Sequence, residues 1–296
     1  MVEHLLPALF AMFLWWGGTG VILVLDGLRR ETFRWTLLGA TVLLAVGLAG
    51  LSASATSLDP PGAYVAFTCA ILVWAWIEVT FLTGLLTGPS KAPCPPGARG
   101  WPRFRAAVAA ILWHELAILA GIAVVIMLAG DGPNRIGLWT FLMLAAMRLS
   151  AKLNIFLGVR NLGEALLPDH LRYIESYFAR RPMNALFPVS VVAGVALCTA
   201  LVAVAAAPGA DAGTAAGFTL LASLAAFGVL EHAFMILPFP PEAMWRWLLP
   251  AARRGGAATP PIAATWPAIR IPNGDHRDRC GAVTKTEAPP PHGSRT

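Results

Sequence analysis

Charged residues are scarce in this chain. Only 13% of its 296 residues are Asp, Glu, Lys or Arg, whereas soluble domains carry about 25%. With 57% hydrophobic residues and a mean hydropathy of +0.65, too little polar surface remains to face water on all sides. The composition excludes an ordinary soluble domain and favours a bilayer as the surrounding solvent.

Recognised chemical motifs are also lacking. The four cysteines (Cys69, Cys94, Cys198 and Cys280) show neither CxxC nor metal-binding spacing. Two lie in apolar runs and two in segments expected in the reducing cytoplasm, so we expect no disulfides. No nucleophile elbow, P-loop or dinucleotide fingerprint is present. The net charge of +6 is scattered through short loops, which argues against nucleic acid as a partner.

What the chain does contain is long apolar runs. A membrane-spanning helix needs about 20 mostly apolar residues. Seven stretches meet this, and Gly- and Pro-rich gaps separate them: 5–25, 36–54, 63–86, 106–129, 136–158, 185–207 and 214–237. The N-terminus has no basic leader, so we expect the first run to remain as a span. The fold class predicted is an all-α, polytopic transmembrane helix bundle of about seven spans.

Basic residues alternate between the loops. Counting from the first loop, 21 of the 22 Lys and Arg residues fall on one side; Arg135 is the exception. The positive-inside rule places the basic side in the cytoplasm. We therefore expect a periplasmic N-terminus and a cytoplasmic C-terminus.

Two segments are expected outside the bilayer. Around residues 167–180, Leu171, Ile174 and Phe178 recur at helical spacing beside Arg172 and Arg180. This predicts either an amphipathic helix on the membrane surface or a loop helix packed on the bundle. Residues 251–296 are rich in Pro, Gly, Ala and Thr, and we expect a disordered cytoplasmic tail after a transmembrane domain of residues 1–250.

Ionisable residues inside the spans are the main candidates for function, because each is costly in a bilayer. Counting about 1.5 Å per residue from the span ends places them in one layer of the cytoplasmic half. The layer comprises Glu78, His114, Glu115, Arg148, Lys152, Glu231 and His232. Arg148 and Lys152 are four residues apart, so each can meet a glutamate from another helix.

Four interpretations of this layer remain open. It can be an ion-pair network that fixes helix register. It can line a pocket for a polar ligand or a tetrapyrrole, with His114 or His232 as axial ligand to magnesium or iron. It can form a carboxylate–histidine metal centre, although the Glu-x-x-His spacing of di-iron bundles is missing. It can also provide a proton or ion path.

A family resemblance narrows these readings. The segments 138–142, 147–161 (Met-Arg-Leu-Ser-Ala-Lys-Leu-Asn-Ile-Phe-Leu-Gly-Val-Arg-Asn), 167–173 and 180–188 resemble the photosynthetic complex assembly protein 2 family of purple bacteria. The segments 229–234 and 243–247 are similar to the same family. The likeness runs from the first span to Trp247 and is most specific between Met147 and Pro188.

The resemblance implies a role in building the photosynthetic apparatus in the bacterial inner (cytoplasmic or intracytoplasmic) membrane: assembly of the reaction centre or light-harvesting complexes, or supply of bacteriochlorophyll to them. It assigns no catalytic residues, and it makes bacteriochlorophyll or another tetrapyrrole a candidate ligand near His114 and His232. Expected partners are the lipid bilayer, reaction-centre or light-harvesting subunits, and bacteriochlorophyll biosynthetic enzymes. We expect an assembly factor without catalytic activity; the alternative is a membrane enzyme or enzyme subunit of bacteriochlorophyll synthesis that uses the Glu/His layer.

Overall fold

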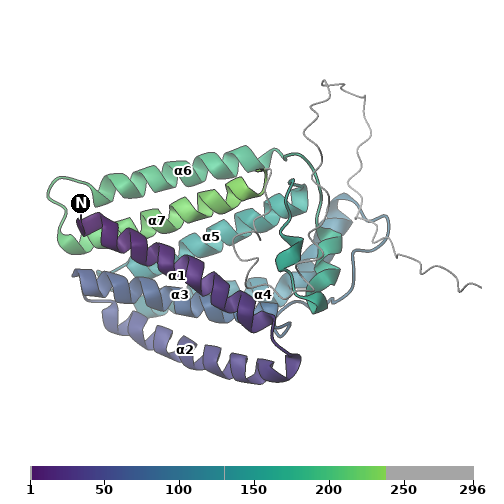
Figure 1. Ribbon diagram of the computed structural model, residues 1–296, viewed down its shortest axis with the longest axis horizontal. Coiled ribbons are helices and arrows are strands. Elements are labelled where there is room, and N and C mark those ends of the chain that lie inside the picture. The colour runs from purple at the N-terminus through teal and green to yellow at the C-terminus, as the bar shows by residue number, and fades with distance from the viewer. Residues whose placement is uncertain (1, 130, 238–296) are drawn as a thin grey trace, which may run out of the picture.

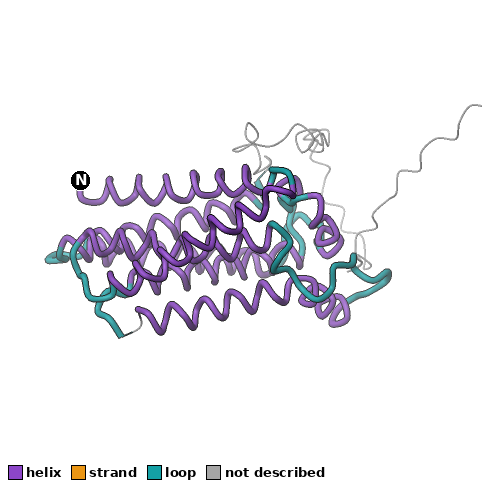
Figure 2. Tube along the Cα trace, turned by 90° about the horizontal axis from the view of Figure 1, so that it is seen from below, coloured by secondary structure: helices purple, strands orange, loops and turns teal. Residues whose placement is uncertain are grey.

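Seven long helices run side by side in the computed structural model, which describes residues 2–129 and 131–237 (Figures 1 and 2). Within this part of the chain the regular structure is helical, and seven helices are long and apolar enough to cross a membrane. They are α1 (Val2–Asp26), α2 (Phe33–Ser54), α3 (Pro60–Leu82), α4 (Gly100–Ala129), α5 (Ile136–Leu157), α6 (Leu186–Ala205) and α7 (Ala212–Phe234). The prediction of a polytopic helix bundle is confirmed. The tail from residue 251 lies outside the described residues.

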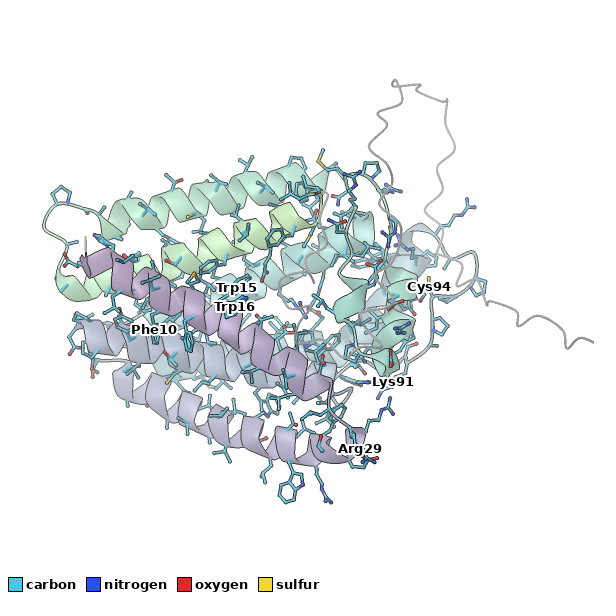
Figure 3. The ribbon with its side chains drawn as sticks, in the orientation of Figure 1. Phe10, Trp15, Trp16, Arg29, Lys91 and Cys94 are labelled. Carbon is cyan, nitrogen blue, oxygen red and sulfur yellow. The ribbon has the colours of Figure 1, made fainter. Side chains whose placement is uncertain are left out.

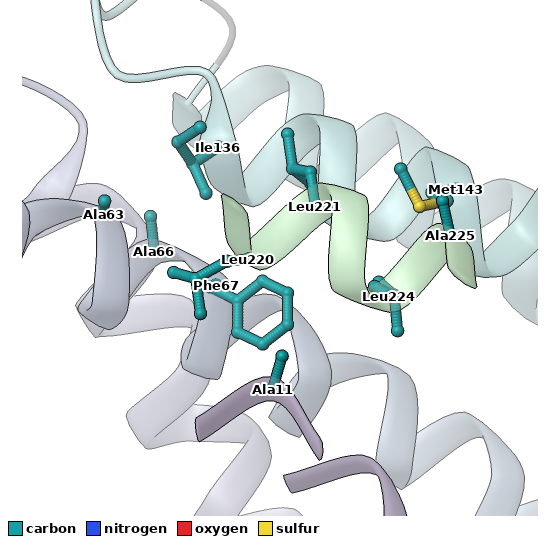
Figure 4. Close-up of a cluster of buried hydrophobic side chains, with 10 residues drawn as sticks. All are labelled: Ala11, Ala63, Ala66, Phe67, Ile136, Met143, Leu220, Leu221, Leu224 and Ala225. Carbon is teal, nitrogen blue, oxygen red and sulfur yellow. The ribbon is translucent and has the colours of Figure 1, made fainter. Parts of the chain in front are cut away.

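Helices α3 and α7 form the centre of the bundle. In each, 56% of the most apolar 18-residue window is buried, against 11% for α2 and α6. Their contact is packed by Phe67, Leu220 and Leu224, with Ala11 of α1 closing one side (Figure 4). Because the outer helices keep most of their apolar surface exposed, that surface suits lipid or another membrane protein.

The starts of α3 and α7 are built alike. Asp59 and Asp211 each accept a hydrogen bond from a backbone N–H of the first turn, at 3.0 and 2.9 Å, and so cap the positive helix end. A Cβ placed on Gly213 would lie 1.7 Å from the Leu58 carbonyl oxygen. Only glycine lets the two capped turns approach this closely.

Two asparagines join helix ends. Asn134 donates to the carbonyls of Ser54 and Gly62 and accepts from the Ile136 N–H, which ties α2, α3 and α5 together. Asn184 does the same between the end of α5 and the start of α6, donating to the Gly158 carbonyl and accepting from the Leu186 N–H. These buried amides satisfy backbone groups that helix ends leave unpaired.

The segment between α5 and α6 packs on the bundle. It forms two 3₁₀ helices, η2 (Glu164–Leu166) and η3 (Asp169–Tyr177), and a third, η1 (Arg30–Thr32), precedes α2. Leu171 and Ile174 of η3 are buried against Phe81 of α3, and Tyr177 is buried against Ala110 of α4. In the structure this segment therefore packs on the helix bundle; its position relative to a membrane surface stays a prediction.

Helix α4 begins six residues before the predicted span, at Gly100. Its Arg103 therefore lies inside the helix and is 5% exposed. The guanidinium donates to the carbonyls of Phe156 and Tyr177, at 3.0 and 2.8 Å, and lies 4.1 Å from the Phe156 ring. Arg103 thus links α4 to the end of α5 and to η3.

Two of the four cysteines, Cys69 and Cys198, carry free thiols. Cys280 lies outside the described residues.

Candidate functional site

The predicted ionisable layer comes from four helices that share one end of the bundle. Glu78 lies on α3, His114 and Glu115 on α4, Arg148 and Lys152 on α5, and Glu231 and His232 on α7. The residues on α3, α5 and α7 lie in the second half of their helices, toward the end of the bundle that carries the basic loops, and those on α4 lie at its middle. Arg29 and Lys91 mark that end of the bundle in Figure 3.

The first ion pair joins α5 to α3. The guanidinium of Arg148 donates to Glu78 Oε2 at 2.7 Å. The Glu78 side chain is 11% exposed and that of Arg148 is 37% exposed, so the carboxylate lies inside the bundle and the cation reaches its surface. Removing either partner would leave the other charge in an apolar surrounding, which is far more costly than losing a surface pair.

The second ion pair joins α5 to α4. Lys152 Nζ donates to Glu115 Oε1 at 2.6 Å, and both side chains are mostly buried. Since Lys152 lies one turn beyond Arg148, one face of α5 meets two glutamates from two different helices, as the four-residue spacing predicted.

On α7, His232 is held at both ring nitrogens. Nδ1 lies 2.7 Å from the Gly228 carbonyl oxygen, and Nε2 lies 2.8 Å from Ser150 Oγ. Because a carbonyl only accepts, Nδ1 donates to it; in the neutral ring Nε2 then accepts from the Ser150 hydroxyl. His232 therefore joins α7 to α5.

Glu231 occupies the outer side of the layer. Its Oε1 accepts a hydrogen bond from the Trp15 indole N–H at 2.8 Å, and the Trp15 ring stacks on Phe227 with ring centroids 4.9 Å apart. The carboxylate also interacts electrostatically with Arg148 and Glu78. Through Trp15, helix α1 becomes a fifth contributor to the layer.

His114 is fully enclosed. Its side chain is 0% exposed, and its ring centroid lies 4.4 Å from that of Phe81. Among the described residues, neither ring nitrogen has a hydrogen-bond partner. Of the seven predicted residues, the structure thus brings four into two ion pairs, joins Glu231 and His232 to other helices through Trp15 and Ser150, and places His114 against Phe81.

The arrangement fits a helix-joining network better than a cofactor site. A magnesium tetrapyrrole needs a histidine nitrogen that faces open space, but both nitrogens of His232 are engaged and His114 is enclosed, so these side chains do not fit that group. A metal centre needs several converging ligands, and the described residues contain no group of three His, Cys, Asp or Glu side chains placed to hold one.

Sequence reasoning missed the uncharged members of the layer. Trp15 and Ser150 make two of its cross-helix hydrogen bonds, yet serine and tryptophan are ordinary in spans. The available signal was position: Ser150 lies midway between Arg148 and Lys152 on α5. Charge counting alone does not show which neutral side chains complete a polar network.

Comparison with known proteins gives the family. A family model described as "Protein of unknown function (DUF3623)" matches residues 1–255. The chain belongs to this family. It is also similar to a protein of Rhodobacter capsulatus described as an "Uncharacterized 30.4 kDa protein in puhA 5'region", with 39% identity over 250 residues that cover 83% of this chain and 91% of the relative. No solved structure matches.

Proposed function

We propose that this protein is an integral membrane factor for assembly of the bacterial photosynthetic complex, acting in the inner membrane with its N-terminus periplasmic and its C-terminus cytoplasmic. The observation that carries the proposal is the relative in the puhA 5′ region, 39% identical along most of both chains. This position supports the proposal together with the resemblance of the sequence to a family of photosynthetic complex assembly proteins.

The bundle supports a role without catalysis. Its acidic side chains at membrane depth are engaged: Glu78 and Glu115 in ion pairs, Glu231 by Trp15. Arg148, Lys152, Glu231 and His232 fall within the segments that carry the family resemblance. We take the layer as the device that holds α1, α3, α4, α5 and α7 in register while other faces meet partners.

The outer helices supply those faces. α2 and α6 expose large apolar side chains such as Val42, Val46, Val189 and Val192, between 53% and 68% exposed. A reaction-centre or light-harvesting subunit can dock laterally on such a surface. The exposed basic residues at one end, such as Arg99 and Arg160, would then face cytoplasmic enzymes of bacteriochlorophyll synthesis.

The test is deletion of the gene in a photosynthetic host, followed by two spectra. The absorption of intact membranes reports assembled pigment–protein complexes, and a solvent extract reports total pigment. We expect assembled complexes to fall several-fold while pigment synthesis continues, and a plasmid copy of the gene to restore them.

Two outcomes would overturn the proposal. A normal complement of complexes would show that the protein is not needed for assembly. Accumulation of one defined tetrapyrrole intermediate, reproduced by Glu115→Gln or Glu231→Gln, would instead support the membrane-enzyme alternative.

A further inference from the structure

The space around Phe81 contains several buried polar atoms without partners. Within the described residues, no hydrogen-bond partner is found for His114 Nδ1 and Nε2, Thr87 Oγ1, Glu78 Oε1 or the Tyr173 hydroxyl. His114 is 0% exposed, Thr87 is 1% and Glu78 is 8%. Native proteins leave only a few such groups unpaired per 100 residues, so several of them in one place call for a physical explanation.

These residues are neighbours. The His114 backbone N–H donates to the Thr87 carbonyl at 3.1 Å, and the His114 ring lies against Phe81. Glu78 is three residues before Phe81 on α3 and so lies on the same helix face. Tyr173 packs against the cluster formed by Phe81, Leu171 and Ile174. Helices α3 and α4, the loop between them and η3 all contribute.

The mixture of donors and acceptors identifies the ligand chemistry. A neutral imidazole offers one donor and one acceptor, a hydroxyl offers both, and an ionised carboxylate oxygen only accepts. A metal ion would need converging acceptors, and an anion would need converging donors. Water both donates and accepts, and buried waters typically make about three hydrogen bonds to groups that are otherwise unsatisfied.

We propose that the site formed by His114, Thr87 and Glu78 Oε1 binds ordered water, one molecule or a short chain reaching toward Tyr173. The water extends the polar layer from the Glu78–Arg148 ion pair toward the basic end of the bundle. It also supplies hydrogen-bond partners for a buried histidine whose ring nitrogens have none among the described residues. This inference does not depend on the proposed role in assembly.

The experiment is nuclear magnetic resonance of the full-length protein in lipid nanodiscs, with ¹⁵N-labelled histidine. Imidazole ¹⁵N shifts report whether each nitrogen is hydrogen-bonded, and transfer of magnetisation from water reports whether water lies beside it. His232 is an internal control, because Ser150 and Gly228 engage both of its nitrogens. The signals that disappear in His114→Phe are those of His114. If the His114→Phe protein does not accumulate in cells, His114→Gln is used in its place.

We expect hydrogen-bonded shifts and rapid water transfer at His114, and hydrogen-bonded shifts with much weaker transfer at His232. Thr87→Val removes one partner of the water at nearly constant volume and should lower transfer to His114 by about twofold or more. Thr199→Val is the matched control, since that exposed hydroxyl donates only to its own helix at Val195.

Three results would overturn the site. Unbonded shifts at both His114 nitrogens, with no transfer from water, would show that nothing binds there. Equal transfer at His114 and His232 would show that water access is general and not a property of this site. Unchanged transfer in Thr87→Val would remove Thr87 from the water's partners and with it the proposed arrangement.

Discussion

Arg148 and Lys152 lie one turn apart on α5, and each meets a glutamate from a different helix. The four-residue spacing predicted this much, because residues four apart share a helix face. Which glutamate pairs with which base depends on how the helices rotate about their axes, and apolar spans without strong periodicity leave that rotation open. For the same reason the roles of Trp15 and Ser150 appear only once the helices are packed.

Glu175 in η3 gives a prediction at the residue scale, outside the spanning helices. Burial raises the pKa of its carboxyl above the ordinary 4.5, against an opposing effect of Arg172. The folded protein therefore keeps a proton on Glu175 that the unfolded chain releases, so the contribution of Glu175 to stability is fully present below pH 4.5 and is lost as the pH rises through the folded pKa.

The measurement is the thermal unfolding midpoint of the detergent-solubilised protein, taken stepwise upward from pH 4.5. Glu175→Gln should remove part of the decline of the unfolding midpoint with rising pH, and should raise the midpoint at neutral pH. Glu31→Gln, which changes an exposed carboxylate, should leave the pH profile as it is. A midpoint that climbs with pH in the wild type, yet not in Glu175→Gln, would contradict the argument.

At the scale of elements, the apolar runs located all seven helices, because apolar length is a local property of the sequence. The ends of the helices were less predictable from the sequence. α4 extends to Gly100 because Arg103 finds carbonyl partners inside the fold, and η3 is a 3₁₀ helix shaped by its contacts with α3 and α4. Both depend on tertiary contacts, which a window of sequence does not contain.

The close approach of α7 to the turn before α3 gives an element-scale prediction. In Gly213→Ala the new Cβ meets the Leu58 carbonyl oxygen, a backbone atom that cannot rotate away. We expect a loss of about 1–3 kcal/mol in unfolding free energy, the usual cost of overpacking.

Gly18→Ala is the matched control, since a Cβ there meets nothing within 4 Å. The control should change stability by less than about 1 kcal/mol, in the stabilising direction expected for Gly→Ala in a helix. Both are read from thermal unfolding in the same detergent. Equal behaviour of the two variants would rule out the close packing of the α3 and α7 starts.

For the whole molecule, the scarcity of charge and the seven apolar runs predicted the bundle, and the structure confirms it. The layer of ionisable residues could also be predicted from the sequence, because the number of residues between a side chain and the end of its span gives its depth in the membrane. The water site around His114 could not, since its polar atoms come from α3, α4, the loop between them and η3, and only packing brings them together.

The orientation in the membrane is a prediction for the whole molecule. Asp131, between α4 and α5, and Arg99, before α4, are both exposed and lie on opposite ends of the bundle. A membrane-impermeant maleimide should label Asp131→Cys in intact spheroplasts, and Arg99→Cys only after permeabilisation. Labelling above the background of the natural cysteines in the reverse pattern would invert the proposed topology.

The ion pair between Glu78 and Arg148 represents the central claim, that one polar layer joins helices distant in sequence. A double-mutant cycle with Glu78→Leu and Arg148→Met, in which the unfolding free energy of each variant is measured in nanodiscs, tests this claim most directly. Each single change should cost about 2 kcal/mol, below the 3–5 of a fully buried pair because Arg148 is 37% exposed.

The double variant should cost only about 1 kcal/mol, because two apolar side chains leave no unpaired charge; against about 4 kcal/mol for the sum of the two single losses, this is a coupling of about 3 kcal/mol. Single losses that simply add, within about 0.5 kcal/mol, would show that the two side chains do not interact across α3 and α5.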